Sequence, residues 1–161
     1  MTPETYQLDE TDRRILLALD SDPRVPIMML AQQLGLARGT VQTRLERLAH
    51  SGALRPNTAR IRPAALGRGV SAYVSAELDQ ARLDEAIEAL RKIPEVLECV
   101  APAGDTDLLI RVAAKDPDDL YRVSEVIRLC PGINRTSTSM ILRDVIPYRT
   151  TSLLKHDTAA E

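Results

Sequence analysis

The sequence is poor in aromatic residues: its 161 residues include four tyrosines, no tryptophan and no phenylalanine. An aliphatic core is therefore expected, and a surface that stacks single-stranded nucleic acid on aromatic rings is disfavoured. The two cysteines, Cys99 and Cys130, are too few for a disulfide framework and have no CxxC spacing. We expect both to be small buried hydrophobic residues.

Membrane and catalytic signals are also missing. No stretch approaches the roughly 20 apolar residues that span a bilayer, and "MTPETYQLDE" lacks the basic and apolar regions of a signal peptide. We therefore expect a cytoplasmic protein without a membrane partner. The only histidines, His50 and His156, form no metal-ligand cluster and no nucleophile pattern with the cysteines. The sequence thus predicts no catalytic residues, no metal, no cofactor and no enzyme activity.

Charge is unevenly distributed in this chain of net charge -2. Residues 38–62 contain six arginines, no lysine and a single acid, Glu46. Arginine is the residue favoured for bidentate contact with phosphate and guanine. The local excess of positive charge favours a DNA-binding surface within an otherwise acidic protein.

Two helices are predicted before this basic segment. The first begins after Leu8 with Asp9 as its N-cap and ends at "DSDPR", residues 20–24. The second begins near Pro26 and ends at Gly35, where a left-handed residue is wanted. After two or three residues a third helix follows, which is the arrangement of a helix-turn-helix.

The third helix has an apolar and a polar face. Val41, Leu45 and Leu48 recur at helical spacing and are expected to face the first two helices. The opposite face is polar and basic, as in a helix that enters the DNA major groove. The alternative is a charged helix face that meets only water. DNA contacts are predicted on this helix for Arg38, Thr40, Gln42, Thr43, Arg44 and Arg47.

A wing is predicted after the third helix. In "SGALRPNTARIRP", Leu54-Arg55 and Arg60-Ile61 have the pattern of two short strands around a "PNTA" turn. Wings usually contact the phosphate backbone, which contributes affinity without reading sequence. Arg55 and Arg60 are accordingly predicted to bind DNA.

The second half of the chain contains a weak repeat at an offset of 37 residues, which places Pro94 over Pro131. Each copy has the pattern strand, helix, turn, strand. The strands are expected at 70–78, 96–101, 107–113 and 133–146, and the helices at Leu83–Ile93 and Asp118–Leu129. Two copies make βαββαβ, a ferredoxin-like α+β domain with both helices on one sheet face. The open face, expected to carry aliphatic Val and Leu, predicts a homodimer through the sheets.

The loop "PAGDTDL", residues 102–108, joins the two copies. Glycine and aspartate favour turns for backbone reasons alone, so spacing by itself favours a plain turn here. The functional alternative is a site in which Asp105 or Asp107 accepts hydrogen bonds from an ammonium group.

Together these segments resemble the Lrp/AsnC (leucine-responsive, feast/famine) family of transcriptional regulators. The resemblance is carried, in order, by "LDETDRRILLAL", "LAQQLGLARGTVQTRLERLAHSGAL", "PAALG", "VLECVAPAGDTDLLIRV" and "CPGINRTSTSMILRDV". It implies double-stranded DNA as partner, an amino acid or related small molecule as effector, and dimers that assemble further, often to octamers. By this resemblance the effector site comprises Gly104, Asp105, Thr106, Asp107, Thr136 and Thr138.

The implied organisation is a winged helix-turn-helix followed by the effector and assembly domain. Its boundaries are a helix-turn-helix at 1–52, a wing or linker hairpin at 53–66, a ferredoxin-like domain at 67–148 and a flexible tail at 149–161. Two positions depart from the family pattern: Ala37 replaces the usual N-cap serine, and Thr106 replaces an aromatic residue. The change at Thr106 implies a re-shaped pocket or a lost effector response. The alternative function is an architectural DNA-binding protein of the same fold that responds to no effector.

Overall fold

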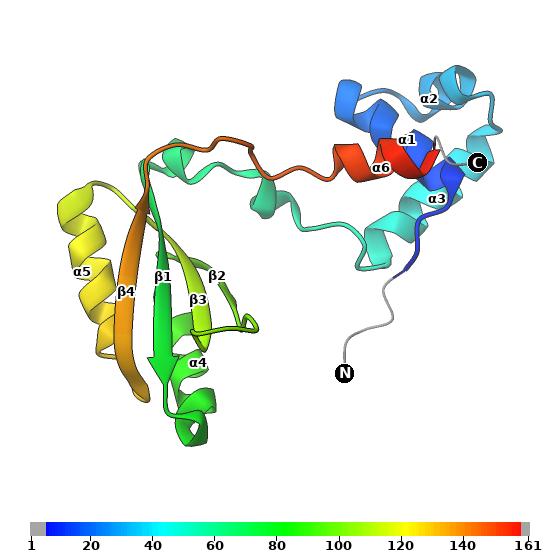
Figure 1. The fold of residues 1–161 in the computed structure, drawn as a ribbon. Coiled ribbons are helices and arrows are strands. Elements are labelled where there is room, and N and C mark those ends of the chain that lie inside the picture. The colour runs from blue at the N-terminus through cyan, green and yellow to red at the C-terminus, as the bar shows by residue number, and fades with distance from the viewer. Residues whose placement is uncertain (1–5, 159–161) are drawn as a thin grey trace. The chain divides into compact units, whose positions relative to one another are not determined.

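The computed structural model describes residues 6–158, which form two compact units. The first comprises the chain up to Ala59 together with the segment from Ile146 onward, and the second comprises Arg60–Val145. Figure 1 shows the helices of the first unit and the sheet of the second. None of the helices within residues 6–158 is long and apolar enough to cross a membrane.

The first unit is a helix-turn-helix domain. Its helices are α1 (Glu10–Ser21), α2 (Ile27–Leu34), α3 (Arg38–His50) and α6 (Thr151–Thr158). The third predicted helix is confirmed as α3, and its apolar stripe is inward, with Val41 and Leu48 fully buried. Val41 closes a core of aliphatic side chains with Ile15, Leu30 and Ala31, and Leu45 packs against this core.

Helix ends follow the expected local chemistry. Asp9 caps α1, where its carboxylate accepts a hydrogen bond from Asp12 N while the Asp12 side chain accepts one from Asp9 N, a reciprocal capping box. Gly35 ends α2 at φ 65°, a left-handed conformation that favours glycine. Ala37 stands at the N-cap of α3 and provides no side-chain hydrogen bond.

The second unit is the predicted βαββαβ domain. It contains β1 (Val70–Leu78), α4 (Leu83–Arg91), β2 (Val96–Val100), β3 (Leu108–Ala114), α5 (Pro117–Arg128) and β4 (Ile133–Ile141). The strands form one antiparallel sheet in the order β2-β3-β1-β4, which is the ferredoxin-like order.

Alternation along the strands separates the two sheet faces. Val74 pairs with Ile110 and Thr138, so the three side chains lie on the same face of the sheet. Helices α4 and α5 cover one face of the sheet (Figure 1). Val74 and Ile110 are fully buried, and Leu90 of α4 and Val123 of α5 pack against them. A single aliphatic core therefore lies between the sheet and its two helices.

The open face is less apolar than expected. The pairing register places Tyr73 and Ser75 of β1 there, with Leu109 and Arg111 of β3 opposite them. The aliphatic residues of β1 and β3 fill the core instead, because they occupy the alternate positions of each strand. The open face is thus mixed polar and apolar, which corrects the expectation of a Val and Leu surface.

Three predicted elements are wrong. No wing forms: residues 54–55 and 60–61 are not strands, and Asn57–Arg60 is a single 3-10 turn, with Ala59 N donating to Pro56 O at 2.9 Å. A second 3-10 turn, Pro63–Leu66, follows. The last strand ends at Ile141 rather than 146, because its pairing with β1 ends at Ser71. Finally, no helix was predicted after the last strand, but residues 151–158 of the tail form helix α6, which contacts α1; residues 159–161 lie outside the described residues.

Candidate functional site

Most of the residues predicted to contact DNA from α3 are exposed, but several of them already have partners within the protein. Arg38, Thr40 and Thr43 are exposed. Gln42 is exposed and donates a hydrogen bond from Nε2 to Glu46 Oε1 at 3.2 Å, one turn further along the same helix. Among the residues described, Arg38 has no ion-pair partner, so its guanidinium extends freely from the first turn of α3.

The other two arginines of α3 are turned toward α1. The Arg44 guanidinium donates hydrogen bonds to Asp9 and, at 3.2 Å, to Asp12 Oδ1. Arg47 lies 3.8 Å from Asp12 Oδ2, and its guanidinium carbon stands 4.9 Å from the centre of the Tyr6 ring. The sequence pattern did not reveal these contacts, because spacing along one helix does not specify what the neighbouring helix offers.

Electrostatics in this cluster follow from the hydrogen bonds. The Arg44 hydrogen bond lowers the pKa of the Asp9 carboxyl below its usual value, and Asp9 in turn raises the pKa of Arg44. A hydrogen bond to Asp12 raises the pKa of the Tyr6 hydroxyl. The Asp9 carboxylate and the Arg44 guanidinium therefore stay charged, and the Tyr6 hydroxyl stays neutral, at physiological pH.

The two arginines predicted outside the recognition helix lie in separate units. Arg55 belongs to the first unit and stacks over the Tyr148 ring at 4.5 Å, which is within cation–π distance. Arg60 is the first residue of the second unit and ends the 3-10 turn Asn57–Arg60.

The predicted effector residues divide into two groups. A cavity of about 350 Å³ brings together Asp105, Thr106 and Thr136. The same cavity is lined by Glu77 and Arg135. Sequence reasoning missed these two residues, because only the pairing of β1 with β4 brings them together. Its remaining lining residues are Ser75, Ala76 and Ser137.

The other predicted effector residues do not line this cavity. The Asp107 carboxylate accepts hydrogen bonds from Leu78 N and from Gln80 Nε2, each at 2.8 Å, so it braces the loop against the end of β1. Thr138 donates to Ser124 Oγ of α5 at 3.0 Å. Gly104 adopts φ 152°, a conformation that L residues rarely adopt, and so shapes the loop through its backbone.

Thr106 holds the loop through its side chain. Its hydroxyl lies 3.0 Å from Ala76 O and 3.1 Å from Leu108 O, and it can donate to either carbonyl. The side chain is half-buried, so the cavity wall at this position is small and its polar atom is satisfied within the protein.

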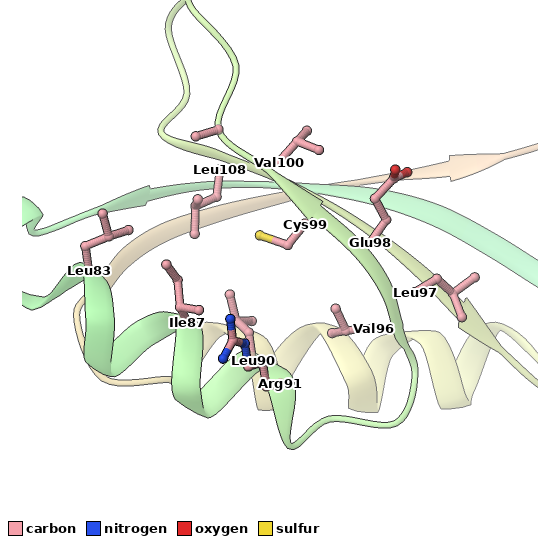
Figure 2. A pocket seen from close by; sticks show the side chains of 11 residues that line it. Leu83, Ile87, Leu90, Arg91, Val96, Leu97, Glu98, Cys99, Val100 and Leu108 are labelled. Carbon is pink, nitrogen blue, oxygen red and sulfur yellow. The ribbon is translucent and has the colours of Figure 1, made fainter. Parts of the chain in front are cut away.

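A second, more apolar groove of about 560 Å³ lies between α4 and the edge strand β2. Figure 2 shows Ile87 and Leu90 rising from α4 toward β2, while Cys99 points back from the strand and Glu98 points away. Cys130 is buried as expected, but Cys99 is exposed, which corrects the expectation for that residue. Partial desolvation still raises the pKa of the Cys99 thiol, which disfavours the reactive thiolate. No group of three or more metal-ligating side chains was found within residues 6–158.

Comparison with known proteins agrees with this architecture. Residues 8–49 match the family model of the AsnC-type helix-turn-helix domain, and residues 71–151 match that of the Lrp/AsnC ligand binding domain. The chain is 30% identical to the HTH-type transcriptional regulator FL11 of Pyrococcus horikoshii over 136 residues, which cover 84% of this chain and 90% of that protein.

Two solved structures show the same fold over nearly the whole chain. The Escherichia coli AsnC structure aligns with a TM-score of 0.81 at 27% identity and covers 91% of this chain and 99% of its own. A feast or famine regulatory protein from Mycobacterium tuberculosis, complexed with L-methionine, aligns with a TM-score of 0.76 at 32% identity and covers 89% and 98%. The chain therefore belongs to the Lrp/AsnC family: it is a transcriptional regulator with a DNA-binding helix-turn-helix and a small-molecule binding domain, and not an enzyme.

Proposed function

We propose that this regulator binds specific DNA sequences in the cytoplasm and that an amino acid, bound in the cavity beside Asp105, controls its DNA binding or assembly. The observation that carries the effector proposal is the charge arrangement of that cavity. Asp105 and Glu77 contribute carboxylates, and Arg135 contributes a guanidinium. Because an amino acid carries both an ammonium and a carboxylate group, these side chains are complementary to both of its ends.

The charged groups are available to a ligand. Arg135 Nη1 lies 3.8 Å from Glu77 Oε1, and the two side chains are 77% and 55% exposed. An exposed pair of this kind contributes little to stability, so exchanging it for contacts with a ligand costs little. Ser75 and Ser137 add hydroxyl groups to the same cavity. A polar amino acid therefore suits the cavity better than a leucine-like one.

A thermal-shift screen of the purified protein against amino acids and their keto acids tests the effector proposal. We expect one compound to raise the melting temperature in the wild type but not in Asp105→Asn or Arg135→Gln. Glu88→Gln is the matched control, because Glu88 is exposed on α4, away from the cavity, and pairs with Arg91 one turn along the same helix. No shift with any compound would contradict an amino acid effector and favour a regulator that does not respond to one.

Sequence-specific DNA binding is proposed for the exposed face of α3, with Thr40, Gln42, Thr43 and Arg47 near the groove and Arg38 beside a phosphate at its edge. Arg55 and Arg60 are proposed as contacts to phosphate. Selection from a random duplex pool tests this proposal: a specific regulator enriches a consensus, which it binds more tightly than a shuffled duplex of the same composition. Equal affinity for both duplexes would favour the architectural alternative.

A homodimer through the open sheet face, and further assembly to an octamer, is also proposed. Arg111 supports this proposal, because its Nε is buried and lacks a hydrogen-bond partner among the described residues, a state that proteins usually avoid. Its guanidinium lies 6.0 Å from the Tyr73 ring on the same face. Tyr73→Glu should therefore lower the mass measured by light scattering, whereas Tyr121→Glu, on the exposed side of α5, should not.

A further inference from the structure

One carboxylate organises the contact between the first helix and the recognition helix. Asp12 of α1 is fully buried, and a buried carboxylate is stable only when it is paired and hydrogen-bonded. We call the five residues Tyr6, Asp9, Asp12, Arg44 and Arg47 the Asp12 cluster. Its members come from the segment before α1, from the start of α1 and from the middle of α3.

Both oxygens of the Asp12 carboxylate are occupied within the protein. Oδ2 accepts hydrogen bonds from the Tyr6 hydroxyl at 2.6 Å and from Asp9 N at 3.3 Å. Oδ1 accepts from Arg44 Nη1 at 3.2 Å. Arg44 also binds Asp9, and only 25% of its side chain is exposed. If Arg44 moved to a DNA phosphate, Asp12 would remain buried without its closest cation, which is strongly unfavourable.

The three arginines of α3 are therefore not equivalent. Arg38 is exposed and unpaired among the described residues, so it can reach DNA without breaking a contact. Arg47 is intermediate: its side chain is 46% exposed, and it approaches Asp12 only to 3.8 Å. Of the three, Arg44 makes hydrogen-bonded ion pairs to both Asp9, the N-cap of α1, and Asp12.

We infer that Arg44 is a positioning residue that fixes the recognition helix against the capped start of α1, and that it does not itself contact DNA. The inference rests on the sequence-specific DNA binding proposed above. The capping box fixes Asp9 and Asp12, these carboxylates fix Arg44, and Arg44 fixes the angle at which α3 presents Thr40 and Thr43. A residue of this kind affects which sequence is read, because base contacts require a defined geometry.

The test compares Arg44→Gln with Arg38→Gln, using the duplex selected by the wild type and a shuffled duplex of the same composition. Affinity is measured over a range of salt concentrations. A plot of log affinity against log salt concentration has a negative slope, and each lost phosphate contact decreases the magnitude of that slope by about 0.9. We expect that decrease in Arg38→Gln and no decrease in Arg44→Gln. Arg44→Gln should instead lower the ratio of selected to shuffled affinity by about tenfold, the discrimination of one base contact.

Asp9→Asn further distinguishes a positioning role of Arg44 from a direct contact between Arg44 and DNA. Asparagine keeps the N-cap hydrogen bond but removes the charge that binds Arg44. A positioning role predicts a lower selected-to-shuffled ratio in Asp9→Asn as well, with partial recovery of the ratio in Arg44→Lys relative to Arg44→Gln. All variants are compared at a temperature where circular dichroism shows them folded, so that simple unfolding does not produce the effect.

Three results would overturn the inference. One is a decrease of about 0.9 in the magnitude of the salt-dependence slope in Arg44→Gln, as expected for a direct phosphate contact. Another is an unchanged affinity ratio in both Arg44→Gln and Asp9→Asn. The third concerns the wild type alone: if it selects no consensus, sequence-specific binding is wrong and the positioning role falls with it, before any variant is made.

Discussion

Arg55 and Tyr148, which are 93 positions apart in sequence, stack with the guanidinium carbon 4.5 Å from the ring centre. The contact joins the segment after the recognition helix to the segment that precedes α6, and both belong to the first unit. Helix α6 also contacts α1. Residues 146–158 are thus part of the helix-turn-helix unit, although the second unit separates them from it in sequence.

The first prediction concerns this C-terminal helix. Leu154 is half-buried on α6, whereas Leu153 is 66% exposed. Leu154→Ala should lower the free energy of unfolding of the first unit by about 1 kcal/mol, because it removes part of a buried aliphatic side chain. Leu153→Ala is the matched control and should leave stability nearly unchanged. Thermal unfolding followed by circular dichroism measures both. Equal effects of the two substitutions would mean that α6 does not pack through Leu154.

Much of the fold could be predicted from sequence, because periodicity and capping residues are local signals. The apolar stripe of the third helix placed Val41 correctly in the core, and the strand predicted at 70–78 is β1. The wing was wrong because two short dipeptides flanked by prolines have no partner strand that could confirm them. Helix α6 was missed because its eight residues show no clear period, and its contact with α1 is visible only in three dimensions.

The candidate sites were predictable only in part, for a related reason. Motif position brought Asp105 and Thr106 to the cavity, but nothing local indicated that Asp107 would be used to hold the loop. Glu77 and Arg135 were missed because they approach each other only through the pairing of β1 with β4. The ion pair between Arg44 and Asp12 could not be predicted for the same reason, because the two residues are 32 positions apart and meet only in the folded structure.

The second prediction concerns Glu95, a buried carboxylate of the ferredoxin-like unit. Burial by itself would raise its pKa, but a hydrogen bond from Arg122 at 2.7 Å, together with the charges of Arg122 and Arg68, lowers the pKa below the usual 4.5. A carboxyl whose pKa is lower in the folded state stabilises the fold above its unfolded pKa. That stability is lost as the pH falls through the folded pKa.

Unfolding measured between pH 7 and pH 3 checks this prediction. The second unit should lose stability as the pH falls below about 4.5, the unfolded value for Glu95. Glu95→Gln should be less stable at neutral pH and should show a flatter dependence in the acid range. Glu98→Gln is the control, because Glu98 is exposed on β2. An acid dependence identical in wild type and Glu95→Gln would assign the effect to other carboxylates.

The third prediction concerns Gly35 in the turn of the helix-turn-helix. An added Cβ would meet no atom within 4 Å, so the cost of Gly35→Ala comes only from the backbone conformation at φ 65°. We expect a loss of about 1 kcal/mol in the stability of the first unit. Gly39→Ala, inside α3 and equally open, should instead stabilise the helix by a similar amount. Chemical denaturation of both variants tests whether the two substitutions change the free energy of unfolding in opposite directions. An unchanged free energy of unfolding in Gly35→Ala would contradict a cost from the left-handed conformation of this turn.

The fourth prediction concerns Thr106, where the family resemblance leads one to expect an aromatic residue. Thr106→Ser keeps the hydroxyl that can donate to Ala76 O, so the loop and the response to an effector should be retained. Thr106→Tyr cannot place its hydroxyl at that carbonyl, and its ring needs space that the cavity of about 350 Å³ now provides. The tyrosine variant should therefore lose the thermal shift given by the wild-type effector. Calorimetric titration of both variants with that effector measures the difference, and retained binding in Thr106→Tyr would place the effector outside this cavity.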